Sequence, residues 1–278
     1  MPEITAAAVK ALRQRTGLPI MDCKRALQEA GGDAEGAVEL LRKAGKKVLE
    51  QGVGRETSEG RIAVHASLDP AQGSIVELQC ESAPVASNKE FVQLARDLAR
   101  QLATGPGAAT PEELLEQPSP SKAPETLKAQ LDELVNRIRE VFRLKRIARI
   151  DGRCGGYVHH DGKTGVLLEV EGSDAALAKD FSMHIAAMRP SVVSRQDLDP
   201  AAVAKEREIL SAQARQEGKP EKIIEKMVEG RLREFYEQHC LWDQPYVKGE
   251  DKKQTVGKVA QAGGLKIVRF IHWELGKE

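Results

Sequence analysis

The chain has 278 residues, enough for one large domain or for two to three small ones. Its lysines and arginines balance its aspartates and glutamates at 42 each, and aromatic residues make up only 4%. A dedicated nucleic-acid binder carries a basic excess to neutralise phosphates and aromatic rings on which bases stack, so the composition argues against direct nucleic-acid binding.

The first fifteen residues contain no apolar segment followed by a cleavage site, as a secretory signal would. No apolar run approaches the roughly 20 residues of a membrane span. The four cysteines are scattered without a C-x-x-C pair, so zinc or redox chemistry is poorly supported. We therefore expect a cytoplasmic protein with reduced thiols, no membrane association, and neither metal nor cofactor.

Residues 1–45 have the pattern of three short helices. Thr5 can cap the first helix and Gly17 can end it, while Pro19 suits the start of the second. Asp33 can cap the third helix. A module this small buries little core, so docking is a commoner role for it than chemistry.

Residues 46–59 are rich in glycine and charge, which is typical of a linker. Residues 60–146 are predicted to form the first core subdomain, opening with the strands RIAVHASL and SIVELQC and a helix over 91–103. A proline-rich surface excursion follows. A long helix is then expected from Glu125 to about Ile147, its basic end suiting the helix dipole.

Residues 147–189 repeat the order strand, turn, strand, kink and helix, which indicates a duplicated β-β-α arrangement. Residues 190–240 are predicted to form an inserted helical hairpin, a candidate surface for homodimerisation. The alternating segment GLKIVRFIHWEL indicates a returning strand, so the second subdomain comprises 147–189 plus 241–278. The predicted fold class is α+β: a three-helix module, a duplicated β-β-α core with antiparallel sheets, and the inserted hairpin.

Candidate reactive groups are few. Cys80 could act as a nucleophile beside a histidine, but it lies on the apolar stripe of its strand, where an inert buried thiol is commoner. The pair His159–His160 could bind a metal, yet neighbouring residues of a strand point to opposite faces. The sequence also lacks the glycine-rich phosphate-binding motifs. The pattern favours a binding protein over an enzyme.

Several motifs resemble those of the bacterial elongation factor Ts family, in order along nearly the whole chain. The stretch EITAAAVKALRQRTGLPIMDCKRALQEAGGD is similar to the family's N-terminal signature, and KPEKIIEKMVEGRLREF to a second signature in its helical hairpin. MHIAAMRP and DQPYVK correspond to two further stretches. The resemblance implies a ubiquitin-associated-like module in residues 1–45 and no enzymatic reaction. It implies guanine-nucleotide exchange on elongation factor Tu, a translational GTPase, by perturbation of its Mg²⁺ and phosphate site.

The resemblance also implies which residues meet the GTPase. The N-terminal module would grip it through Leu12, Arg13, Ile20 and Met21. A second surface would involve Ile138, His159, Tyr246 and Val247. A tip at the junction between the second strand and its helix would reach the magnesium site through Ser82, Ala83, Pro84 and Val85.

This tip departs from the family motif Thr-Asp-Phe-Val-Ala, because alanine and proline stand at 83 and 84. Alanine lacks the carboxylate, and proline has neither a phenyl ring nor an N–H. One hypothesis is exchange that depends on the backbone shape of the tip and on docking elsewhere. The alternative is a non-catalytic binding partner or chaperone of the GTPase that has lost the wedge. An enzyme using Cys80 or His159 has the weakest support.

Overall fold

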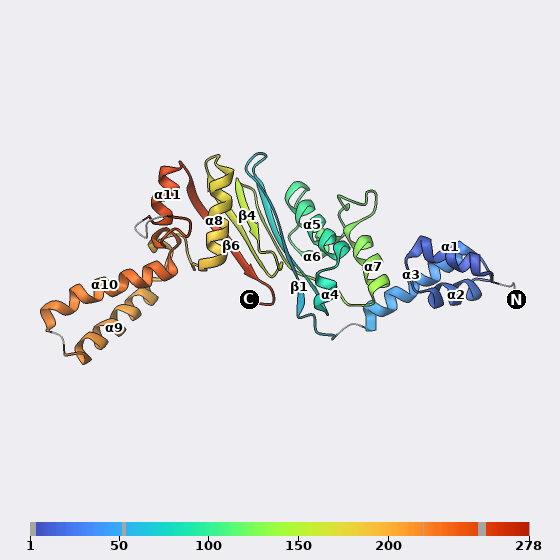
Figure 1. The fold of residues 1–278 in the computed structure, drawn as a ribbon, viewed down its shortest axis with the longest axis horizontal. Helices are drawn as coiled ribbons and strands as arrows, with labels where there is room; N and C mark the ends of the chain where they lie inside the picture. Colours follow the sequence, from blue (N-terminus) through green and yellow to red (C-terminus); the bar gives the residue numbers. More distant parts are fainter. Residues whose placement is uncertain (1–3, 52–53, 219, 250–253, 278) are drawn as a thin grey trace. The chain divides into compact units, whose positions relative to one another are not determined.

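The structure is a computed structural model that describes residues 4–51, 54–218, 220–249 and 254–277. The chain divides into two compact units. Unit 1 comprises Met1–Ala63, Val76–Ala148 and Leu275–Glu278, and unit 2 comprises Val64–Ile75 and Arg149–Glu274. Helices and two three-stranded sheets make up the ribbon in Figure 1, which confirms the predicted α+β class.

The N-terminal module of unit 1 consists of α1 (Ala6–Thr16), α2 (Ile20–Glu29) and α3 (Ala34–Gln51), the blue helices of Figure 1. The caps expected from the sequence are confirmed. The Thr5 hydroxyl accepts a hydrogen bond from the N–H of Ala8 at 3.2 Å, and the Asp33 carboxylate accepts from the N–H groups at the start of α3. Gly17 ends α1 in the left-handed conformation at φ 67°.

The module has a small apolar core of its own, and α3 is longer than expected. The helix continues to Gln51, so the first part of the predicted linker 46–59 is helical, which the prediction of a linker with some helix allows. The next element, a strand, begins at Glu59. The buried core residues of the module are Val9, Leu12, Leu18, Cys23, Ala26, Leu27, Ala37 and Leu41.

The first sheet has the order β1-β2-β3, with β1 at Glu59–Ser67, β2 at Gln72–Cys80 and β3 at Arg143–Ile150. The helices between β2 and β3 are α4 (Ala83–Ala86), α5 (Lys89–Thr104), α6 (Pro111–Leu115) and α7 (Leu127–Ile138). Helix α5 buries Phe91, Leu94, Leu98 and Leu102, the helical spacing that predicted it. The ring of Phe91 meets that of Phe142 edge to face, with centroids 5.0 Å apart.

The long helix predicted from Glu125 to about Ile147 is wrong. Helix α7 ends at Ile138, because Arg139 adopts the left-handed conformation at φ 66° and its N–H closes the helix on the carbonyl of Val135. The basic segment after it is strand β3, which pairs with β2. Leu144 is buried while Arg143 and Lys145 are exposed, so the segment alternates as a strand does.

Unit 2 contains the second sheet, in which β4 (Cys154–Val158), β5 (Thr164–Glu171) and β6 (Lys266–Glu274) run antiparallel in that order. Helix α8 (Ala175–Met188) packs on β4 and β5, as the duplicated β-β-α pattern predicts. The buried side chains between α8, α11 (Val256–Ala262) and the sheet include Val166, Leu168, Phe181, Ile185, Leu241 and Ile267.

The predicted helical hairpin is confirmed as α9 (Pro200–Gln216) and α10 (Glu221–His239), the orange helices of Figure 1. Its two helices share a narrow apolar seam made by Leu210, Ala214, Ile224, Val228 and Leu232. Short 3₁₀ turns at Arg195–Asp197 and Leu241–Asp243 flank the hairpin. None of the helices in the described part of the chain is both long and apolar enough to span a bilayer.

Candidate partner-binding site

The junction between β2 and α5 projects a short exposed turn from unit 1. Ser82 is extended, at φ −130° and ψ 148°, and α4 follows it at once. Pro84 lies in the first turn of α4, where its fixed φ suits a helix and its missing N–H costs nothing. Ala83 and Pro84 are exposed, whereas Val85 packs partly against the core. The predicted tip is therefore a surface feature with one buried edge.

The carboxylate of Glu140, in the segment between α7 and β3, holds the tip. Ser82 donates its backbone N–H to one carboxylate oxygen of Glu140 at 3.1 Å and its hydroxyl to the other at 2.5 Å. In return, Glu81 accepts the backbone N–H of Val141 at 2.8 Å and pairs with Arg55 at 3.3 Å. Each segment thus binds a backbone donor of the other with a carboxylate, the stronger kind of hydrogen bond.

Cys80 belongs to this support and not to a reactive centre. Burial first, and the nearby charge of Glu140 second, raise the pKa of the Cys80 thiol to about 12. The thiol therefore stays protonated at neutral pH, and it donates to the carbonyl of Ser82 at 3.3 Å. A nucleophilic cysteine needs a lowered pKa, so the enzyme hypothesis gains nothing from this residue.

The predicted docking residues of the N-terminal module divide into exposed and buried ones. Ile20 and Met21, in the first turn of α2, are 49% and 64% exposed, and Arg13 is exposed on α1. Leu12 is buried in the core of the module, so it supports the surface from inside. Two neighbouring exposed apolar side chains form the kind of patch that marks an interaction surface.

The residues predicted for the second surface belong to both compact units. Ile138 ends α7 in unit 1 and packs partly against the core there. His159, Tyr246 and Val247 belong to unit 2. Val247 is 56% exposed, while Tyr246 is half-buried with its ring edge-on to Phe181.

A buried histidine, which the sequence suggested only as a possible partner of Cys80, fixes the loop that carries Tyr246 and Val247. His184 on α8 accepts the N–H of Val247 on Nδ1 at 3.3 Å, and its Nε2 bonds to the side-chain oxygen of Gln244 at 2.9 Å. The ring also stacks on Tyr246 at 29°. Burial lowers the pKa of His184, and the bond to Gln244 only partly opposes that effect. The neutral form is the one that can accept from Val247.

The placement expected for His159 and His160 is wrong. Strand β4 ends at Val158, so both histidines lie in the following turn and not on opposite faces of a strand. Their ring centroids are 4.3 Å apart, and Nδ1 of His159 lies 2.9 Å from the Tyr157 hydroxyl. Among the described residues, no group of three His, Cys, Asp or Glu side chains is placed to hold a metal ion.

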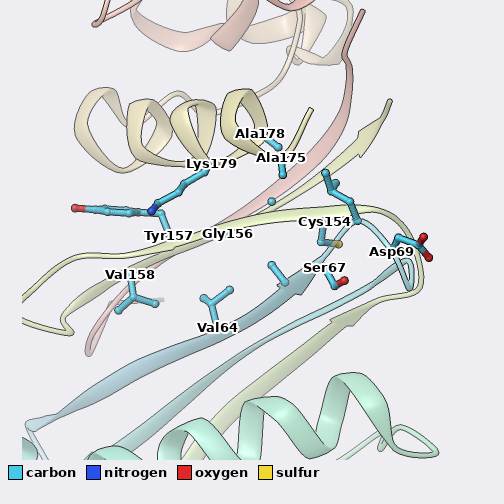
Figure 2. A pocket seen from close by; sticks show the side chains of 13 residues that line it. Val64, Ser67, Asp69, Cys154, Gly156, Tyr157, Val158, Ala175, Ala178 and Lys179 are labelled. Carbon is cyan, nitrogen blue, oxygen red and sulfur yellow. The ribbon is translucent and has the colours of Figure 1, made fainter. Parts of the chain in front are cut away.

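Unit 2 also has a groove of about 540 Å³ that none of the predicted site residues lines. Figure 2 shows Lys179 and Tyr157 at one end of it and Ser67 and Asp69 at the other. Most of its wall is aliphatic or glycine, and burial raises the pKa of Cys154 in that wall to about 12. The lining of the groove is therefore mostly apolar, and its cysteine stays protonated at neutral pH.

The exposed apolar pair on a small helical module, the fixed projecting turn and the inert thiol define a class of protein: an α+β scaffold suited to binding another protein. Comparison with known proteins gives the family. A family model described as "Elongation factor TS" matches residues 84–277. The chain is 44% identical to elongation factor Ts of Methylococcus capsulatus over 277 residues, 99% of this chain and 92% of that protein.

Two further relatives bear the same name. Elongation factor Ts of Thioalkalivibrio sulfidiphilus is 39% identical over 99% of this chain and 92% of its own length. That of Aquifex aeolicus is 40% identical over 96% of both chains. The chain belongs to the elongation factor Ts family, so it is a translation elongation factor by descent.

Proposed function

We propose that this protein is a guanine-nucleotide exchange factor for elongation factor Tu, acting in the cytoplasm during translation elongation. The observation that carries the proposal is the family match over nearly the whole chain. The exposed Ile20 and Met21 and the projecting tip give that match two physical contact surfaces.

Exchange follows from linkage between two binding equilibria. An exchange protein that binds the nucleotide-free GTPase more tightly than the nucleotide-bound form must weaken nucleotide binding by the same ratio of affinities. Docking through Arg13, Ile20 and Met21 of unit 1 and through His159, Tyr246 and Val247 of unit 2 would supply the binding energy. The tip would convert part of that energy into distortion of the site that holds GDP.

The distortion that we propose is applied by backbone shape. The bound nucleotide is held largely by Mg²⁺ and by a loop of backbone N–H groups around its phosphates. Ser82, Ala83, Pro84 and Val85 place a compact, rigid turn where the family motif has an acid and an aromatic ring. A turn of fixed shape can displace a phosphate loop by steric contact, without supplying a ligand to the metal.

A second candidate function has a specific observation in its favour. Ala83 and Pro84 are exposed and carry neither a carboxylate nor an aromatic ring. A protein that docks on the GTPase without moving its nucleotide would be a binding partner or chaperone. The two functions differ in one measurable quantity, the rate of nucleotide release.

That rate is measured with elongation factor Tu loaded with fluorescent GDP and chased with excess unlabelled GDP. Addition of this protein is expected to accelerate the loss of fluorescence in proportion to its concentration until the rate saturates. Complex formation followed in parallel by light scattering gives the affinity. A stable complex with no acceleration would establish the binding-partner function instead.

A further inference from the structure

We infer that Glu140 is a positioning residue for the exchange tip: its carboxylate fixes Ser82 and, through Ser82, the exposed backbone of Ala83 and Pro84. The inference rests on the proposed function and assigns part of it to a residue that acts through Ser82. Three features of unit 1 carry it, namely the geometry at Ser82, the anchoring of Glu140, and the chemistry that the tip lacks.

The geometry at Ser82 restrains both position and orientation. The two oxygens of Glu140 receive two different donors of one residue, the N–H at 3.1 Å and the hydroxyl at 2.5 Å. The hydroxyl of Ser82 does not cap α4, although Ser commonly does so at this position. The carbonyl of Ser82 accepts the N–H of Ala86 at 3.1 Å, so the residue that Glu140 holds is also the first residue of the tip's only turn.

Glu140 is itself held by the core. Arg139 before it closes α7 in the left-handed conformation, and Val141 and Phe142 after it are each 5% exposed. The bond from the Val141 N–H to Glu81 at 2.8 Å ties the same segment to the other side of Ser82. The tip is thus connected to the core by two carboxylates that cross between adjacent segments.

The position of this tip matters more than it would if the tip carried a carboxylate and an aromatic ring. A four-residue helix has no stability of its own, because a single turn costs more entropy than its hydrogen bonds return. Ala83 and Pro84 present only backbone and short apolar surface to a partner. Their effect on the GTPase therefore depends on where the anchor places them, and small displacements of a positioned group can be costly.

The test compares Glu140→Ala, Ser82→Ala and the double variant with Glu112→Gln, a control that changes an exposed glutamate on α6 of the same unit. GDP release from elongation factor Tu is followed over a range of factor concentrations. Each single variant is expected to lower the maximal rate by about tenfold, since about 1.4 kcal/mol of positioning corresponds to that factor. The concentration giving half of the maximal rate is expected to change less than twofold, because the docking surfaces are intact.

The double variant separates positioning from general destabilisation. If Glu140 acts through Ser82, the double variant releases GDP as slowly as Glu140→Ala alone and no more slowly, since neighbouring residues of one network are not additive. Glu140→Gln is expected to recover part of the rate, because an amide can still accept the N–H and donate to the hydroxyl. A merely structural glutamate would instead lower the stability of each variant without lowering the maximal release rate of the folded protein.

Amide hydrogen exchange of the free protein provides a readout independent of the GTPase. The N–H of Ser82 is expected to be protected in the wild-type chain and to lose protection at least tenfold more in Glu140→Ala than in Glu112→Gln. If the wild-type chain fails to accelerate GDP release, the proposed function fails, whatever Ser82 shows. If it does accelerate release and Glu140→Ala matches Glu112→Gln in maximal rate, the positioning role is overturned while the function stands.

Discussion

The two β-β-α repeats of the core follow one plan and differ at the junction between second strand and helix. In the first repeat, residues 81–88 separate β2 from α5, form the extra turn α4, and are held by Glu140 from the segment between α7 and β3. In the second repeat, only residues 172–174 separate β5 from α8. The scaffold is therefore shared, and the first junction alone is enlarged into a projecting surface.

The second junction is fixed by backbone geometry instead of by a distant side chain. Gly172 has φ 127°, and a Cβ there would lie 2.8 Å from the carbonyl oxygen of Gly264. The Asp174 carboxylate then caps α8 by accepting the N–H of Leu177 at 2.9 Å. The short turn between β5 and α8 is thus fixed by a glycine and a helix cap, whereas the exposed tip between β2 and α5 is fixed by a carboxylate from elsewhere in the chain.

The largest effect is expected at the junction between β5 and α8. Gly172→Val forces a branched side chain into a conformation that is almost confined to glycine, and it also collides with the backbone. We expect the free energy of unfolding to fall by about 2 to 3 kcal/mol. Urea unfolding measures it, with Gly230→Ala in α10 as the control.

Gly230 is helical, and a Cβ there would meet no atom within 4 Å, so alanine is expected to raise stability by about 0.5 to 1 kcal/mol. Equal unfolding midpoints for the two glycine variants would show that the second junction is not held by its backbone geometry.

The next effect separates docking from the action of the tip. Replacement of both Ile20 and Met21 by serine removes exposed apolar surface from α2 without touching the core of the module. We expect the affinity for elongation factor Tu to fall by about 2 kcal/mol, roughly 30-fold, with the release rate at saturation unchanged. Titration of the release rate measures both quantities.

Lys24→Ser, at another exposed position of the same helix, is the control for the docking pair and is expected to bind normally. A lowered rate at saturation with unchanged affinity would assign Ile20 and Met21 to the action of the tip instead.

A smaller effect is expected from restoring the family residues to the tip. Ala83→Asp with Pro84→Phe adds a carboxylate and a ring at two exposed positions, so folding should be unaffected. We expect GDP release to become about tenfold faster, since a hydrogen bond to a charged group is worth about 1.5 kcal/mol. Ser173→Asp, an exposed position of the second junction, should leave the rate as it is.

An unchanged or slower rate for the restored tip would mean that its present shape is already matched to the partner. The comparison of the two junctions would then rest on shape alone.

The smallest effect concerns pH and the loop held by His184. Because burial lowers the pKa of His184 in the folded chain, the unfolded chain takes up a proton first as pH falls below about 6.5. Stability from this residue is therefore complete above that pH and is lost as pH falls through the lowered pKa of the folded chain. Each pKa unit of difference between the folded and the unfolded chain corresponds to about 1.4 kcal/mol in the free energy of unfolding.

Urea unfolding at pH 7.5 and 5.5, in the wild-type chain and in His184→Gln, isolates this contribution from those of other groups. The variant is expected to lose less stability between the two pH values. The same loss in both chains would exclude His184 as the source.

Local signals in the sequence predicted much of the fold correctly. The caps at Thr5 and Asp33 and the end of α1 at Gly17 depend on contacts within a few residues, so the sequence alone specifies them. The boundary between α7 and β3 was missed, because Ile138 and Val141 continue the apolar spacing of the preceding helix. That spacing is typical of a helix, and the pairing with β2 that makes residues 143–150 a strand is not visible in it.

The candidate site shows the same division. The kink at Ser82 follows from a short sequence pattern, and Ile20 and Met21 were singled out by the family resemblance, whereas the structure decided that both are exposed. The roles of Glu140 and His184 do not, because their partners Ser82 and Gln244 lie 58 and 60 residues away in the chain. With the segment around Glu140 expected to be helical, nothing in the sequence placed its carboxylate beside the tip.

Sequence patterns alone predicted most of the helices and strands, though not β3, together with the duplicated β-β-α plan and the missing acid and ring at positions 83 and 84. These are properties of neighbouring residues, and neighbours interact whatever the rest of the chain does. The tertiary structure decided that the kink at Ser82 is a fixed tip. Carboxylates from segments far apart in sequence stabilise it only once the sheet has brought those segments together.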